Sequence, residues 1–200
     1  MLKLLRKLAK DLLMSPPRGV KSGPDSFIQR PRLIQGAQFI TIGERTFIGQ
    51  HSWLGALSTY GGRGYRYLPS LIIGDNVNIG RFVCLTTISN ITIGDGCLLS
   101  EHVYISDHTH QMDPSAGLIV EQPLVSKGPV HIGANSFLGY RVCILPGVIL
   151  GKYCIVGANS VVTHSFPDYS VIAGSPARLI RTNSPLRPKS VSVIGAVSSD

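Results

Sequence analysis

Aliphatic side chains recur at every sixth position between residues 132 and 162. The series has no gap and consists of Ile132, Leu138, Ile144, Leu150, Val156 and Val162. A period of six fits neither an α-helix, whose period is about 3.6, nor a plain strand, whose period is about 2. The feature therefore predicts a structural unit that is repeated along the chain, as in a solenoid.

The same spacing extends toward the N-terminus in three further groups. They are Ile42, Ile48 and Leu54; Ile73, Ile79 and Leu85; and Ile93, Leu99 and Ile105. Glycine follows many of these residues, and a compact residue usually stands four positions after them. If each hexapeptide is a short strand and a corner, three of them make a triangular coil, with the aliphatic residue inside and glycine relieving the backbone at the turn. The fifteen positions predict an all-β prism of about five coils.

Three interruptions break the six-residue spacing. Residues 56–70 and 106–129 are long insertions, and two extra residues between Leu85 and Ile93 predict a bulge at a corner. A regular solenoid does not need long loops, and long loops in compact domains are usually functional. We therefore expect the chemistry of the protein at the two insertions.

The ends of the chain are basic. Residues 1–32 carry eight Lys and Arg against two Asp, and residues 33–177 carry seven against eight Asp and Glu. We divide the chain into a basic N-terminal amphipathic helix and linker (1–32), a β-helix domain (33–181) and a flexible, Ser-rich tail (182–200). Two interpretations of the helix stay open: it packs on the prism or a neighbouring subunit, or residues 1–14 contact a membrane surface.

Composition excludes several classes of protein. The near-neutral body argues against nucleic-acid binding in spite of the net charge of +8. No apolar run of about 18 residues is present to span a bilayer, and the N-terminus lacks the pattern of a signal peptide. Four cysteines without a pairing pattern favour a reducing compartment. We expect a cytoplasmic protein, and a peripheral position at the inner membrane surface stays open as an alternative.

Two segments resemble the hexapeptide-repeat acyltransferases. They are ILPGVILGKYCIVGANSVVTHSFPDYSVIAGSPARLI at 144–180 and DHTHQMDP at 107–114, within a resemblance that covers about residues 33–181. It implies a left-handed parallel β-helix, a homotrimer, and transfer of an acetyl group from acetyl-CoA without a metal. The chain looks most similar to the enzymes that O-acetylate sugars of surface polysaccharides (capsule, exopolysaccharide or O-antigen), alongside the galactoside and maltose acetyltransferases.

Attack by a sugar hydroxyl on a thioester requires a general base, for which histidine is suited near neutral pH. The resemblance assigns this role to His110, with His108 as the second choice. Asp107, Asp113 and Glu121 are the three candidates to orient the imidazole, and the sequence does not choose among them.

The resemblance also implies a donor groove between adjacent subunits. The residues implied along the pantetheine arm are Tyr140, Gly157, Ala158 and Thr163, with His164 where many members have Lys. Arg178 and Arg181 are expected at the phosphates, because phosphates require fixed positive charge. The alternative for these two arginines is a solvated basic tail.

The acceptor is expected at the first insertion. Residues 60–67 (YGGRGYRY) offer Arg63, Tyr65 and Tyr67 to a sugar or to an anionic, lipid-linked glycan; the alternative is a protrusion that packs on a neighbour. Phe137 stands where sugar-modifying relatives often have Trp, and is expected to form an apolar wall beside the thioester.

Three other functions stay open. The first is acetyl transfer to a different acceptor, either an amino group of a nucleotide sugar or a hydroxyl of an antibiotic. A zinc-dependent, carbonic-anhydrase-like hydratase would need three converging imidazoles, for which His102, His108 and His110 are available. The last alternative is a trimeric scaffold without activity.

Overall fold

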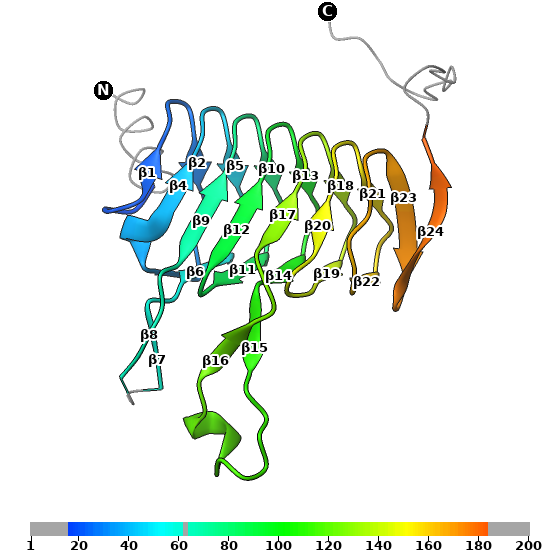
Figure 1. Cartoon of the computed structure of the whole chain (residues 1–200). Coiled ribbons are helices and arrows are strands. Elements are labelled where there is room, and N and C mark those ends of the chain that lie inside the picture. Colours follow the sequence, from blue (N-terminus) through cyan, green and yellow to red (C-terminus); the bar gives the residue numbers. More distant parts are fainter. Residues whose placement is uncertain (1–15, 62–63, 184–200) are drawn as a thin grey trace, which may run out of the picture.

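The computed structural model describes residues 16–61 and 64–183. The chain is a left-handed parallel β-helix, in which short strands of successive coils pair side by side on three faces (Figure 1). Face A consists of β1 (Lys21–Ser22), β4 (Ile40–Ile42), β9 (Ser70–Ile73), β12 (Asn90–Ile93), β17 (Val130–Ile132) and β20 (Ile149–Leu150). One short 3-10 helix, η1 (Ala37–Phe39), precedes β4. No helix of the described ranges is long and apolar enough to cross a membrane.

Faces B and C complete the triangle. Face B consists of β2 (Phe27–Ile28), β5 (Phe47–Ile48), β10 (Asn78–Ile79), β13 (Leu98–Leu99), β18 (Phe137–Leu138), β21 (Ile155–Val156), β23 (Ser170–Gly174) and β24 (Ala177–Thr182). Face C consists of β3 (Leu33–Gln35), β6 (Trp53–Ala56), β11 (Cys84–Thr87), β14 (Tyr104–Ser106), β19 (Cys143–Ile144) and β22 (Val161–Val162). Pairing on these faces is parallel except for β23 with β24, which closes face B as an antiparallel hairpin.

The predicted aliphatic core is confirmed. None of the fifteen aliphatic positions is more than 2% exposed, and they form one continuous cluster along the prism. The compact residues four positions later, such as Thr46, Cys97 and Ser160, are also buried. The period of six therefore reports the distance from one inward position to the next around the triangle.

The role expected for the corner glycines is corrected by the structure. The left-handed backbone lies at the third position after the aliphatic residue, for example at Asn76 (φ 54°) and His102 (φ 60°). The glycine directly after the aliphatic residue instead lies against the next coil: a Cβ at Gly133 would stand 2.4 Å from the carbonyl carbon of Gly151. Glycine is thus required by the close approach of stacked coils rather than by the turn.

The prism begins earlier than the sequence predicted. Strands β1, β2 and β3 form a coil between Lys21 and Gln35, and the first two of these strands lie in the range 1–32 that the sequence assigned to a helix and linker. The six-residue spacing missed this coil because Ser22 stands at its first position, although Ile28 is fully buried at its second. The predicted helix at 2–13 and the tail beyond residue 183 lie outside the described residues.

Both insertions are hairpins that leave the prism at the edge between faces C and A (Figure 1). The first pairs β7 (Thr59–Tyr60) with β8 (Tyr65–Arg66). The second pairs β15 (His108–His110) with β16 (Leu124–Ser126) and carries the 3-10 helix η2 (Ile119–Glu121) near its tip. The bulge predicted between Leu85 and Ile93 is the turn from β11 to β12 on the same edge.

Neighbouring residues on β9 test the assignment of inward and outward positions. Ile73 is 1% exposed and Ile72 is 40% exposed. Ile73→Ala should lower the free energy of unfolding by about 2–5 kcal/mol, because it leaves a cavity in the aliphatic core. Ile72→Ala should have a much smaller effect. Urea denaturation of both variants measures the difference, and equal losses would contradict the assignment.

Candidate active site

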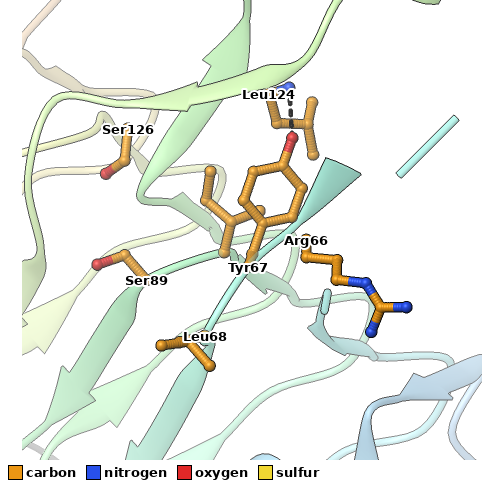
Figure 2. Close-up of a pocket in the computed structure, with 7 residues that line it drawn as sticks. Arg66, Tyr67, Leu68, Ser89, Leu124 and Ser126 are labelled. Carbon is orange, nitrogen blue, oxygen red and sulfur yellow. Dashed lines mark hydrogen bonds between the residues drawn. The ribbon is translucent and has the colours of Figure 1, made fainter. Parts of the chain in front are cut away.

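The two hairpins are joined by tyrosines of the first insertion. The backbone N–H of Leu124 donates to the Tyr67 hydroxyl at 2.9 Å, and the Tyr65 hydroxyl donates to the backbone carbonyl of Glu121 at 3.3 Å. Figure 2 shows the Tyr67 ring reaching across a cavity of about 490 Å³ to Leu124. The hydroxyls of both tyrosines thus bind the neighbouring hairpin, and the expected contact of their rings with the acceptor stays a prediction. Arg63 lies outside the described residues.

A buried carboxylate holds the root of the second hairpin. Asp107 is fully buried, and its Oδ2 accepts hydrogen bonds from the Thr87 hydroxyl at 2.6 Å and from the backbone of Ser89 and Asn90 at 2.9 and 2.8 Å. Its Oδ1 accepts a further bond from the backbone N–H of Ile88 at 3.0 Å. Asp107 therefore accepts hydrogen bonds from the backbone N–H groups of the bulge, where the parallel pairing between coils is interrupted.

His108 has a carboxylate partner. Its Nδ1 lies 3.0 Å from Asp107 Oδ1 and 3.2 Å from the Ser106 hydroxyl, and its side chain is 10% exposed. Burial alone would raise the pKa of Asp107, but hydrogen bonds from His108, Thr87 and the backbone of Ile88 and Ser89 together hold that pKa below its ordinary value. Asp107 thus stays ionised and fixes the ring of His108.

His110 is exposed on the same strand and faces the first hairpin. Its ring meets that of Tyr60 edge-on, with centroids 5.3 Å apart, and its Nδ1 lies 3.4 Å from the Tyr60 hydroxyl. Of the three carboxylates expected to orient an imidazole, Asp107 binds His108, and Asp113 accepts from the Ser115 hydroxyl at 2.7 Å. The ring of His110 is thus open to solvent, whereas that of His108 is largely covered.

The residues expected to bind the donor are divided between two edges of the prism. Tyr140, Gly157 and Ala158 follow strands of face B, on the edge between faces B and C. Thr163 and His164 follow β22 on the edge between faces C and A, where the Thr163 hydroxyl lies 3.2 Å from His164 Nδ1. Face C separates the two groups, so one chain does not bring them together.

Two arginines expected at phosphates lie exposed on β24. Arg178 donates to the backbone carbonyl of Ala177 at 3.1 Å, and Arg181 donates to the Asn183 side chain at 3.2 Å. Neither forms an ion pair with an acidic residue of the described chain. Phe137 points outward from face B, 38% exposed, between Leu98 and Ile155 of the neighbouring strands.

Two faces of the prism expose apolar side chains, and the third is mixed. The outward positions in register on face C are Leu33, Trp53, Cys84, Tyr104, Cys143 and Val161, and those on face B are Phe27, Phe47, Asn78, Leu98, Phe137, Ile155 and Val171. On face A they are Lys21, Thr41, Ile72, Thr92, His131 and Ile149. The outward positions of faces B and C are thus more apolar than those of face A.

The edge between faces B and C carries a column of stacked rings. Phe82 stacks between His51 and His102 at 5.1 and 4.9 Å, and His102 meets Tyr140 edge-on at 5.4 Å. His102 thus lies across face C from the strand of His108 and His110. Within residues 16–61 and 64–183, no group of three His, Cys, Asp or Glu side chains is arranged to hold a metal ion.

Sequence reasoning missed Trp53, Tyr60 and Arg66, which line a second cavity beside the first hairpin. Tyr60 and Arg66 belong to the YGGRGYRY segment, which the sequence did single out, but the residues chosen from it were Arg63, Tyr65 and Tyr67. Trp53 directly precedes an inward aliphatic position, and its outward direction follows from the alternation of a strand.

Comparisons with known proteins identify the repeats. A family model described as "Hexapeptide repeat of succinyl-transferase" matches residues 129–164. The chain is 38% identical over 112 residues to the probable acetyltransferase Rv3034c of Mycobacterium tuberculosis, covering 56% of this chain and 37% of that protein. It is 38% identical over 117 residues to the putative lipopolysaccharide biosynthesis O-acetyl transferase WbbJ of Escherichia coli, covering 56% of this chain and 60% of that protein.

The chain thus spans less than two thirds of either relative. Among solved structures, it resembles AntD, an N-acyltransferase from Bacillus cereus in complex with dTDP and 3-hydroxybutyryl-CoA, with a TM-score of 0.67 and 20% identity. The likeness covers 92% of this chain and 89% of AntD. At that identity, the comparison establishes the left-handed β-helix fold, in agreement with the prediction.

Replacement of Asp107 tests its role as hydrogen-bond acceptor for the bulge at residues 87–90. Asp107→Asn should lower the free energy of unfolding at pH 7 by about 1–3 kcal/mol, because a buried amide N–H₂ would face donors that now bind Oδ2. Since the pKa of Asp107 is lower in the folded chain, its carboxylate stabilises the fold fully above the ordinary value of 3.8, and this contribution is lost as the pH falls below it.

The difference between wild type and Asp107→Asn in urea denaturation should therefore shrink as the pH is lowered from 5 toward about 2. Asp25→Asn, which changes an exposed carboxylate of the first coil, is the matched control and should change little. A difference that does not depend on pH would contradict the assignment of Asp107 as an ionised acceptor.

Proposed function

We propose that this hexapeptide-repeat protein is an acyltransferase that moves an acetyl group from acetyl-CoA to a sugar hydroxyl in the synthesis of a surface polysaccharide. The observation that carries the proposal is the exposed His110, set on β15 where the two hairpins meet. The names of the two relatives support acetyl transfer, and that of WbbJ supports a hydroxyl acceptor in a cell-surface glycan.

In the proposed reaction, His110 accepts the proton of the acceptor hydroxyl while the oxygen attacks the thioester carbonyl. A C–O bond forms, the C–S bond breaks, and the proton passes from His110 to the sulfur of the departing thiolate. Asp107 and His108 do not exchange protons with the substrate in this account. They hold β15 against the corner of the prism, so that His110 keeps its position beside the first hairpin.

The residues of the expected donor groove fit an extended acyl-CoA. Ala158 is exposed on a corner that offers backbone amides to a pantetheine arm, and Arg178 and Arg181 supply positive charge without an acidic partner in the described chain. Because Ala158 and His110 lie on different edges, the groove requires a second subunit to meet His110.

A homotrimer satisfies this requirement. The edge between faces A and B then lies on the threefold axis, so that the edge between faces B and C of one subunit, with Ala158, meets the edge between faces C and A of the next, with His110. We further propose a cytoplasmic location, with contact of the basic residues 1–14 to the inner membrane surface.

The fold of AntD favours a second candidate, transfer to an amino group of a nucleotide sugar, because that neighbour is an N-acyltransferase crystallised with dTDP. An acceptor panel of hydroxyl and amino sugars distinguishes the two. Zinc content of the purified protein tests the hydratase alternative, since a stoichiometric metal would contradict acyl transfer by a histidine base alone.

Replacement of the proposed base tests the mechanism. His110→Ala should reduce the release of coenzyme A thiol in the presence of acceptor by at least about 100-fold, the usual scale for loss of a general base. His131→Ala, an exposed histidine on face A, is the matched control and should retain the wild-type rate. Thiol release that survives in His110→Ala would show that the proton is taken by another group.

A further inference from the structure

A cavity of about 610 Å³ lies between the first hairpin and the N-terminal strands of face C. It is lined by Gln35, Trp53, Leu57, Thr59, Tyr60, Gly61, Gly64 and Arg66. Aromatic, amide, hydroxyl and guanidinium groups all converge there, in a volume typical of small-molecule sites. The cavity is separate from the donor residues, which lie in the C-terminal coils and on β24.

Trp53 forms a fixed wall of this cavity. Its indole N–H donates to the Gln35 side-chain carbonyl at 3.2 Å. Gly55 leaves space for the indole ring, because a Cβ at that position would stand 3.1 Å from Trp53 Nε1. The indole ring is therefore fixed by the hydrogen bond to Gln35 and by packing near the backbone of Gly55, as expected for a preformed binding surface.

Tyr60 connects the cavity to the proposed base. It lines the cavity and also makes the edge-on ring contact with His110, with its hydroxyl 3.4 Å from Nδ1. A ligand that rests on Trp53 and Tyr60 thus lies next to His110. The cavity is placed to present an acceptor group to this histidine.

Arg66 gives the cavity its charge. The side chain is exposed, and within the described chain its guanidinium has no hydrogen bond and no ion pair. Arg66 lines this cavity and also the one beneath Tyr67, and Figure 2 shows its side chain directed away from the Tyr67 ring. An unpaired guanidinium at the rim of an aromatic cavity is suited to bind a carboxylate or phosphate in bidentate fashion.

We infer that this cavity binds the acceptor as an anionic saccharide, with the pyranose ring against Trp53 and Tyr60 and its carboxylate or phosphate on Arg66. The inference rests on the proposed function, since it names the substrate class of that same site. A uronic acid and a sugar phosphate share the required chemistry, namely an apolar ring face and a negative group.

The chain contains one tryptophan, so its emission reports on this cavity alone. Titration of the full-length protein with glucuronate, glucose 1-phosphate and glucose, followed by tryptophan fluorescence, measures binding without any need for turnover. A saturable change with an anionic sugar, at concentrations where glucose has little effect, is the expected result. A response to glucuronate alone identifies a uronic acid, and one to glucose 1-phosphate alone identifies a phosphorylated sugar.

Arg66→Gln should weaken the binding of the anionic sugar by about 10-fold or more, the scale of one charge-assisted hydrogen bond. Arg45→Gln removes an exposed guanidinium from the edge between faces A and B and should leave the binding constant unchanged. The inference is overturned if neither anionic sugar changes the emission, or if Arg66→Gln binds as tightly as wild type.

The same titration separates the inference from the proposed function. Saturable binding with no thiol release from acetyl-CoA would contradict acyl transfer and keep the cavity as a saccharide site. Thiol release with an anionic sugar, at a KM that Arg66→Gln does not change, would support acyl transfer and contradict the cavity.

Discussion

The close stacking of coils is the constraint on which the rest of this structure depends. Inward aliphatic residues fix the radius of the prism, and the backbone of one corner lies so near the next that a Cβ at Gly133 or Gly139 would meet the neighbouring coil at 2.4 or 2.8 Å. Each coil therefore has one register relative to its neighbours. A long insertion is tolerated only where the chain leaves an edge and returns to the next coil without disturbing that register.

Both insertions use the edge between faces C and A, and this common origin brings them together. Asp107 replaces the interrupted ladder at that edge with four hydrogen bonds to residues 87–90, and so makes a rigid base for β15. Tyr65 and Tyr67 then join the first hairpin to the second. The position of His110 is thus set by the prism, although the histidine itself stands on a projecting hairpin.

The sequence predicted the features that depend on periodicity and left open those that depend on side-chain contacts. The inward positions could be predicted because each coil repeats the same geometry. The first coil was missed because Ser22 stands where the six-residue series requires an aliphatic residue. The sequence named three carboxylates beside the histidines, but burial of Asp107 beneath the bulge is a property of the folded corner. For the same reason it did not reveal that Tyr65 and Tyr67 face the second hairpin while Tyr60, Arg66 and Trp53 line a cavity.

We propose that the base and the donor groove come from different subunits, because face C separates His110 from Ala158 within one chain. Mixed trimers of two inactive variants test it directly: His110→Ala lacks the base, and Ala158→Trp fills the groove from an exposed corner. If each site combines two chains, equal mixing should restore about a quarter of the wild-type thiol release per site by random assembly. No recovery in mixed trimers of confirmed mass would contradict the account and place base and groove in the same chain.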